Sequence, residues 1–173
     1  RLAAIHRAVA SGADVALISR GGYGLTRILA DIQYKKVARA IEKGTQFVGI
    51  SDFTAFQSAV LATTGAITWA GPALCEGFGV GGTPAELAKS ELKVAAPDEI
   101  MQACFDDMLL GQGEGSGWRQ HRERKENAID TVATSSLKNK NRSTFVVKNS
   151  VLWGGNLTVL TSLLGTPYFP QIK

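Results

Sequence analysis

One serine in this sequence stands where a catalytic hydroxyl would be expected. The apolar run at 46–50 predicts a short buried strand, and Ser51 follows it directly. Phe53 and Phe56 then begin a stretch with helical spacing, so a sharp strand-to-helix turn is predicted at Ser51, which would hold a nucleophile up for attack. The backbone N–H of Asp52, at the start of this helix, could stabilise a developing oxyanion. A serine before a helix is also a common N-cap, and the local pattern leaves both interpretations open.

A second loop, rich in glycine, follows the strand predicted at 14–19. The apolar residues of that strand lead into residues 20–24, with the sequence RGGYG. Two parallel strands would then end in loops at one edge of a sheet, where α/β proteins bind ligands, and neighbouring glycines let backbone N–H groups face a substrate. A tight turn that needs positive φ has the same glycine pattern, so this motif alone does not separate a binding loop from a turn.

The elements that must hold these loops alternate between helix and strand. Helices are predicted at 1–11, 24–43 and 52–64, and strands at 14–19, 46–50 and 67–69. This alternation indicates an α/β fold with a parallel sheet and covering helices. The third strand runs into Gly71 and Pro72, so that three loops would surround Ser51. Later elements are helices predicted at 84–92, 98–110 and 157–164 and a strand at 144–147.

Four sequence blocks carry a family resemblance. They are residues 19–24 (SRGGYG), 49–55 (GISDFTA), 69–72 (WAGP) and 152–157 (LWGGNL), and the closing 164–168 (LGTPY) adds a fifth. In this order they closely resemble the LD-carboxypeptidases, also called muramoyltetrapeptide carboxypeptidases. The similarity spans most of the chain except about 79–150. It implies a serine peptidase of Ser-His-Glu type that removes the terminal D-alanine from the peptidoglycan tetrapeptide.

The resemblance assigns roles to residues of both loops. Ser51 would be the nucleophile, and the backbone N–H groups of Asp52 and Gly22 would form the oxyanion hole. The side chain of Asp52 is a poor proton acceptor for a serine, because a carboxylate of ordinary acidity is too weak a base. The backbone of this residue is therefore the better candidate.

Substrate-binding residues are predicted in the glycine-rich loop and in the block at 152–157. They are Arg20, Gly21, Tyr23, Trp153, Gly154 and Asn156. Arg20 could bind a substrate carboxylate in bidentate fashion or pair with a structural acid, and Tyr23 could cover the site or donate a hydrogen bond. The GGN sequence at 154–156 could line a cleft or form a turn with an asparagine helix cap.

The two histidines of the sequence do not match the catalytic histidine of the family. His6 is predicted on the surface of the first helix, and His121 lies among arginines and a lysine that disfavour its charged form. The family's glutamate and histidine lie beyond the block at 164–168, and its members begin with a further βα unit before the region that matches Arg1. We therefore interpret the sequence as an internal fragment, inactive or nearly so by itself, because a serine needs a positioned base.

The basic residues gather in one segment. Residues 119–148 hold eight Lys or Arg and three acids, against a net charge of +4 for the chain. We predict an α/β nucleophile-bearing domain at 1–115, a basic flexible insertion at 116–143 and the start of a smaller, β-rich C-terminal domain at 144–173. The insertion could be a solvated loop or could attract a carboxylate-rich substrate. No nucleic-acid-binding motif accompanies it.

Neither a cofactor nor a metal is expected. Cys75 and Cys104 have no C-x-x-C spacing and no histidine nearby. No apolar run approaches the roughly 18 residues that cross a bilayer.

The function that the resemblance implies is that of a serine carboxypeptidase, a hydrolase of peptidoglycan recycling in the cytoplasm. Ser51 would attack the carbonyl of a diamino acid–D-alanine bond in a murein peptide. No nucleic acid or membrane partner is expected, and a homodimer is left open. One alternative is a branch of the same family that hydrolyses peptide–nucleotide antibiotics such as microcin C and confers immunity. The other is a non-catalytic binding or scaffold remnant.

Overall fold

A parallel sheet forms the centre of the fold, as predicted. The computed structural model describes residues 1–79, 97–112 and 153–171 of the chain. In these residues the strands β1 (Val15–Leu17), β2 (Gln46–Gly49) and β3 (Trp69–Ala70) make a sheet with the order β1-β2-β3. All neighbours are parallel, with Ala16 opposite Phe47 and Val48 opposite Trp69. The carboxyl ends of the three strands therefore meet at the same edge.

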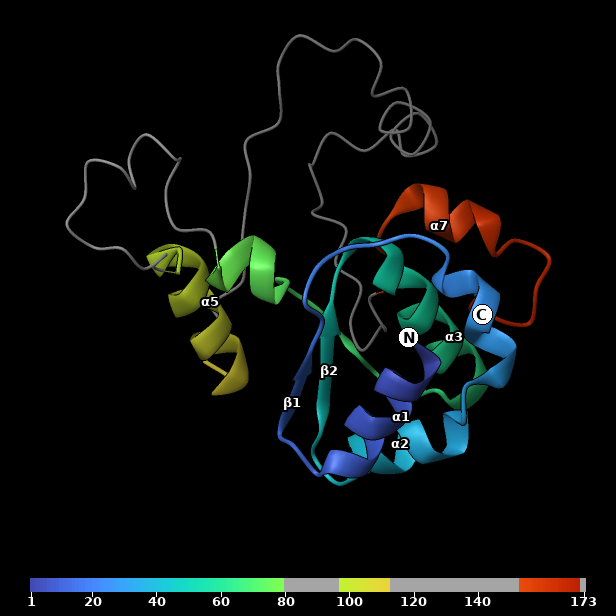
Figure 1. Cartoon of the computed structure of the whole chain (residues 1–173), viewed down its shortest axis with the longest axis horizontal. Helices are drawn as coiled ribbons and strands as arrows, with labels where there is room; N and C mark the ends of the chain where they lie inside the picture. Colours follow the sequence, from blue (N-terminus) through green and yellow to red (C-terminus); the bar gives the residue numbers. More distant parts are fainter. Residues whose placement is uncertain (80–96, 113–152, 172–173) are drawn as a thin grey trace, which may run out of the picture. The chain divides into compact units, whose positions relative to one another are not determined.

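Helices follow each strand or precede it. They are α1 (Leu2–Ser11), η1 (Leu25–Asp31), α2 (Tyr34–Glu42), η2 (Ser51–Phe53) and α3 (Thr54–Thr64), and Figure 1 shows α1, α2 and α3 beside the strands β1 and β2. This alternation confirms the predicted α/β class. The helices predicted at 1–11 and 52–64 and the strands at 14–19, 46–50 and 67–69 are present, with ends that differ by up to two residues.

The single helix predicted at 24–43 is wrong. The structure has a 3-10 helix, η1, and the α-helix α2, separated at Ile32 and Gln33. Ile32 is extended, with φ −73° and ψ 132°, and its side chain is buried in the core. The carbonyl of Leu29 accepts from the hydroxyl of Tyr34 at 2.8 Å and from the N–H of Ile32 at 3.3 Å, so both bonds tie the break to the end of η1. Burial of this side chain, with a smaller contribution from Tyr168, raises the pKa of Tyr34 above its ordinary value.

The core lies between the sheet and the helices and includes a residue from near the end of the chain. Its members are Leu25, Leu29, Ile32, Val37, Ala40, Phe47, Ala55, Phe56, Ala59, Val60 and Leu163. Phe56 is fully buried, with ring centroids 4.8 Å from Phe53 and 5.6 Å from Phe47. Aromatic packing thus joins α3 to β2 directly behind the turn at Ser51.

Side-chain hydrogen bonds from α3 tie the ends of two strands together. The amide of Gln57 donates to the carbonyl of Trp69 at 2.7 Å and to that of Gly49 at 3.2 Å. These bonds satisfy two carbonyls at the carboxyl edge of the sheet, one from β3 and one from β2. They hold α3 in a fixed place relative to both strand ends.

The described end of the chain packs on the same core. Helix α7 (Leu157–Ser162) contacts α3, and the described residues 1–79, 97–112 and 153–171 belong to one compact unit. Tyr168 lies 6.1 Å from Tyr34, and Phe169 lies 5.4 Å from Trp153, both measured between ring centroids. The segment 153–171, predicted as part of a second domain, therefore contributes to this unit.

The remaining predictions divide between described and undescribed residues. The helix predicted at 98–110 is present as α5 (Glu99–Leu109), where the Asp98 carboxylate caps the helix by accepting from the N–H of Met101 at 2.7 Å. The elements predicted at 84–92 and 144–147, and the domain boundaries at 115/116 and 143/144, lie outside the described residues. The division into domains therefore stays a prediction. Within the ranges that the structure describes, no helix has the length and apolar character needed to span a bilayer.

Leu163→Ala should destabilise the protein by about 2–5 kcal/mol, because it empties a core position that is 2% exposed. The neighbouring Leu164→Ala is the matched control, since that side chain is 60% exposed and should change the free energy of unfolding by less than about 0.5 kcal/mol. Urea unfolding of both variants measures the difference. Equal effects would contradict the packing of the segment 153–171 into this core.

Candidate active site

The backbone at Ser51 is strained, at a turn from strand to helix. β2 ends at Gly49, Ile50 is extended, and Ser51 has φ +60°. Among the described residues it is the only one other than glycine with positive φ. Such a conformation costs a serine about 1–3 kcal/mol and is frequent at active sites, including the strand-to-helix turn that presents a nucleophilic serine.

The alternative role of Ser51 as a helix cap lacks its hydrogen bond. Ser51 is the first residue of η2, and within the described residues no hydrogen bond joins its hydroxyl to a backbone N–H of η2 or α3. An N-cap serine would accept a hydrogen bond from a backbone N–H of the following turn. The hydroxyl at this position is therefore not used by the helix that follows it.

The turn is possible because its strand ends in glycine. A Cβ on Gly49 would lie 2.5 Å from Cδ1 of Phe53 and 2.9 Å from Cδ1 of Ile18. The Phe53 ring folds back over the end of β2 and occupies that space. Glycine at this position thus permits the close packing that supports Ser51.

The glycine-rich loop lies against the serine. The position that a Cβ would take on Gly21 is 3.1 Å from both Cβ and Oγ of Ser51, so only a glycine brings the backbone this close. The equivalent position on Gly22 is 3.7 Å from Oδ2 of Asp52. The structure thus brings both predicted oxyanion residues, Asp52 and Gly22, to the loop region around Ser51, while the glycine directly beside the hydroxyl is Gly21. The oxyanion roles stay predictions.

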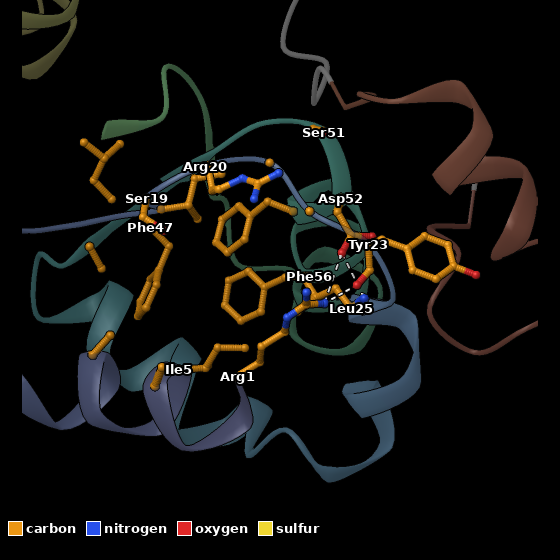
Figure 2. A pocket seen from close by; sticks show the side chains of 18 of the residues that line it. Arg1, Ile5, Ser19, Arg20, Tyr23, Leu25, Phe47, Ser51, Asp52 and Phe56 are labelled. Carbon is orange, nitrogen blue, oxygen red and sulfur yellow. Dashed lines mark hydrogen bonds and ion pairs between the residues drawn. The ribbon is translucent and has the colours of Figure 1, made fainter. Parts of the chain in front are cut away.

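The Asp52 side chain fastens the two loops together. It is 9% exposed, and its Oδ2 accepts a hydrogen bond from the N–H of Leu25 at 3.0 Å. Nη1 of Arg1 lies 4.0 Å from the same oxygen and also donates to the carbonyl of Tyr23. Figure 2 shows Arg1 reaching from α1 to both partners. These contacts give the carboxylate a structural use, in keeping with the prediction that it is not the base.

Sequence reasoning missed Glu76. After β3 the chain crosses to β1, where the N–H of Leu74 donates to Ile18 at 2.8 Å and that of Cys75 to Ser19 at 2.7 Å. This crossing brings Oε1 of Glu76 to 3.2 Å from the N–H of Gly21, which donates to it. The signal was available, because a third loop was predicted around Ser51 and Glu76 is the only acid in residues 71–79.

The predicted binding residues fall into two groups. Arg20, Gly21 and Tyr23 line the pocket that contains Ser51, although the Tyr23 ring is 76% exposed and points away from the serine (Figure 2). Its ring lies 5.2 Å from the guanidinium carbon of Arg27.

The other predicted binding residues, Trp153, Gly154 and Asn156, are not in that lining. The backbone N–H of Asn156 donates to Oγ1 of Thr54 at 3.0 Å, and its side chain caps α7 by accepting from Val159 at 3.1 Å. Of the two interpretations that the sequence left open for residues 154–156, the turn with an asparagine helix cap is therefore present. A role of these three residues in binding stays a prediction.

Apolar and charged residues line the pocket, and of the charged ones Arg1, Arg20 and Glu76 are exposed at its rim whereas Asp52 is buried. The pocket has a volume of about 1020 Å³, and Phe47 and Phe56 are among its apolar residues. His6 does not line it, and the Nε2 of that histidine accepts from the N–H of Gln33 at 3.3 Å. His121 lies outside the described residues, and in the described part no group of three or more His, Cys, Asp or Glu could hold a metal ion.

The first part of the chain matches a known family. Residues 1–71, which include both loops and all three strands, match the family model Peptidase_S66, described as the LD-carboxypeptidase N-terminal domain. This part of the chain is therefore similar to the amino-terminal domain of the LD-carboxypeptidases. This confirms the resemblance that the sequence blocks carried.

Solved structures resemble residues 1–71 and the residues that follow them. The muramoyltetrapeptide carboxypeptidase from Oxalobacter formigenes is 26% identical, with a TM-score of 0.59 over 97% of this chain and 45% of that one. Microcin C7 self immunity protein MccF is 22% identical in its apo state, with a TM-score of 0.53, covering 92% and 45% of the two chains. In its complex with aspartyl sulfamoyl adenosine it is 20% identical, with a TM-score of 0.58, covering 98% and 48%. The likeness to MccF shows the fold alone, and the chain spans less than half the length of these structures.

Gly49→Ala should destabilise the protein by about 1–3 kcal/mol, because the new methyl overlaps the Phe53 ring and forces the turn at Ser51 to shift. Gly154→Ala is the control, since nothing lies within 4 Å of its added Cβ. Urea unfolding of each variant gives the free energy. If both variants unfold like the unchanged protein, the close packing behind Ser51 is not as described.

Proposed function

We propose that this chain carries the nucleophile of a serine carboxypeptidase. The observation that carries the proposal is the positive φ of Ser51 at a strand-to-helix turn, in a part of the chain that is similar to the amino-terminal domain of the LD-carboxypeptidases. The hydroxyl oxygen attacks the carbonyl of the substrate's last peptide bond and forms an acyl-enzyme, while the terminal amino acid leaves with a proton on its amine. Water then hydrolyses the ester and regenerates the serine.

The negative charge that forms on the carbonyl oxygen needs donors near Ser51. The backbone N–H of Asp52 follows the nucleophile directly, and the proposal assigns the second donor to the glycine-rich loop at Gly22. Fixed backbone N–H groups of this kind stabilise the tetrahedral intermediate without reorganising during the reaction. The contacts of Asp52 with Leu25 and Arg1 support this role, because they hold the turn and the loop at a constant distance.

The serine also needs a base that takes its proton. The Ser-His-Glu arrangement that the resemblance implies gives this task to a histidine oriented by a glutamate. His6 is not proposed for it, because its Nε2 is bound to the backbone of Gln33 and the side chain does not line the pocket. The proposal therefore concerns the nucleophile and the oxyanion donors, and the activity is that of the whole protein.

The proposed substrate is a murein tetrapeptide that loses its terminal D-alanine, in peptidoglycan recycling in the cytoplasm. The support is the 26% identity to a muramoyltetrapeptide carboxypeptidase over nearly the whole chain. Arg20, on the rim of the pocket, is proposed to bind the terminal carboxylate that a carboxypeptidase must recognise. A hydrolase of peptide–nucleotide antibiotics is the second candidate, favoured by the fold it shares with MccF.

In the whole protein, Ser51→Ala should lower the rate of D-alanine release from the tetrapeptide by about 10⁴-fold or more, because it removes the attacking atom. Ser162→Ala, an exposed serine outside the pocket, is the control and should keep the full rate. Chromatography of released D-alanine measures both variants. A parallel reaction with a fluorophosphonate, followed by mass spectrometry, should place the label on Ser51.

The possible results separate the candidates. Unchanged release by Ser51→Ala would exclude Ser51 as the nucleophile. Label on Ser51 without tetrapeptide hydrolysis, together with cleavage of a peptide–nucleotide conjugate, would favour the antibiotic hydrolase. Neither label nor hydrolysis would favour a binding or scaffold protein.

A further inference from the structure

A carboxylate lies beside the candidate nucleophile. Oε1 of Glu76 is 3.6 Å from the position that a Cβ would take on Gly21, and Oγ of Ser51 is 3.1 Å from that same position. The carboxylate and the hydroxyl therefore flank one short stretch of backbone. Both residues line the same pocket. A substrate group next to the carbonyl that Ser51 attacks would lie within reach of the charge on Glu76.

The backbone holds Glu76 in this place. It is part of η3 (Leu74–Phe78), which follows the crossing from β3 to β1. The hydrogen bonds to Ile18 and Ser19 fix the start of this helix on the carboxyl end of β1, and the N–H of Gly21 donates to the Glu76 carboxylate at 3.2 Å. Main-chain atoms make these contacts, both at the start of η3 and in the glycine-rich loop. The fold around Ser51 therefore sets the position of the Glu76 side chain.

The two carboxylates of the pocket differ in how their charge is compensated. Asp52 has a cation, Arg1, at 4.0 Å, and this is the only ion pair within the described ranges. Glu76 has no cationic side chain of the described residues within 4.0 Å, and it accepts a hydrogen bond from the neutral peptide N–H of Gly21. Among the described residues, therefore, none compensates the charge of Glu76 as Arg1 compensates that of Asp52, and a cation that enters the pocket could do so.

We propose that Glu76 is a specificity-determining residue that selects substrates by charge. It favours a cationic group, an ammonium or guanidinium, on the residue whose carbonyl Ser51 attacks, and it disfavours a carboxylate there. This inference rests on the proposed function. Arg20, on the same rim, provides the opposite charge for the terminal carboxylate, so the pocket suits a substrate with a cation on one side of the scissile bond and an anion on the other. At distances of several ångströms in a partly solvated site, one charge changes affinity by about tenfold.

The test uses three acylated dipeptides that end in D-alanine and differ only in the residue before it: lysine, norleucine or glutamate. Their dissociation constants are measured by calorimetry with the Ser51→Ala variant of the protein, so that no hydrolysis interferes. We expect the lysine peptide to bind about tenfold more tightly than norleucine and the glutamate peptide about tenfold more weakly. Adding Glu76→Gln, which keeps an oxygen for the N–H of Gly21, should bring the three values together.

Glu42→Gln is the matched control, because it removes the same charge from an exposed side chain at the end of α2, outside the pocket. It should leave the order of the three peptides unchanged. Equal binding of the three peptides, a preference that survives Glu76→Gln, or no binding of any peptide would overturn the proposal. The role of Ser51 is judged separately by fluorophosphonate labelling, so a charge preference without labelling would retain Glu76 and reject the nucleophile.

Discussion

The strained backbone at Ser51 is the constraint on which the surrounding structure depends. A left-handed serine costs about 1–3 kcal/mol, and burying a phenylalanine of the size of Phe56 contributes about 3–5 kcal/mol relative to alanine. The packing of Phe53 and Phe56 behind the turn is therefore large enough to offset the strain. The space for it exists only because Gly49 has no side chain. The strained residue and the side chains that offset its strain thus lie next to each other. The turn therefore keeps its shape without a capping hydrogen bond.

Polar contacts then place the second loop against this turn. The carboxylate of Asp52 joins the residue after Ser51 to the start of η1 and, through Arg1, to the first helix. These three segments lie far apart in the sequence but meet at one oxygen atom. The hydrogen bond and the nearby cation offset part of the free-energy cost of burying this carboxylate, a cost that a carboxylate without partners would bear in full. The glycine-rich loop thus gains a fixed position beside the serine hydroxyl, which a loop of small residues would not hold by itself.

The sequence predicted those parts of the fold that depend on neighbouring residues. Apolar runs that end in polar or glycine residues gave the strands, and the order of strand, Ser51 and helix gave the turn, because each pattern is completed within about ten residues. The continuity of the helix at 24–43 was predicted wrongly, because Ile32 fits a helical period as well as it fits the extended break that buries it. The spacing of apolar residues along the sequence cannot show whether the core requires a helical or an extended backbone at this position.

Long-range placement was the other limit. Glu76 lies 55 residues from Gly21 in the sequence, and only the crossing from β3 to β1 brings it to the serine. Asn156 could be read as a cap or as a binding residue, since the same side chain serves both uses and the sequence does not show which partner is near. The sequence therefore predicted that a site lies at the edge of the sheet. Which side chains meet there could be learned only from the structure.

The hydrogen bond between Asn156 and Thr54 has a consequence for the order in which the chain folds. Thr54 opens the helix that follows Ser51, and its partner lies 102 residues later. During synthesis from the amino terminus, the sheet and the turn are complete long before that partner leaves the ribosome. Closing so long a segment carries an entropic cost that the earlier, local contacts do not have. The nascent serine turn must therefore stand first on its aromatic packing and on the polar contacts of Asp52 and Gln57, and it acquires its last support only when Asn156 and Leu163 arrive.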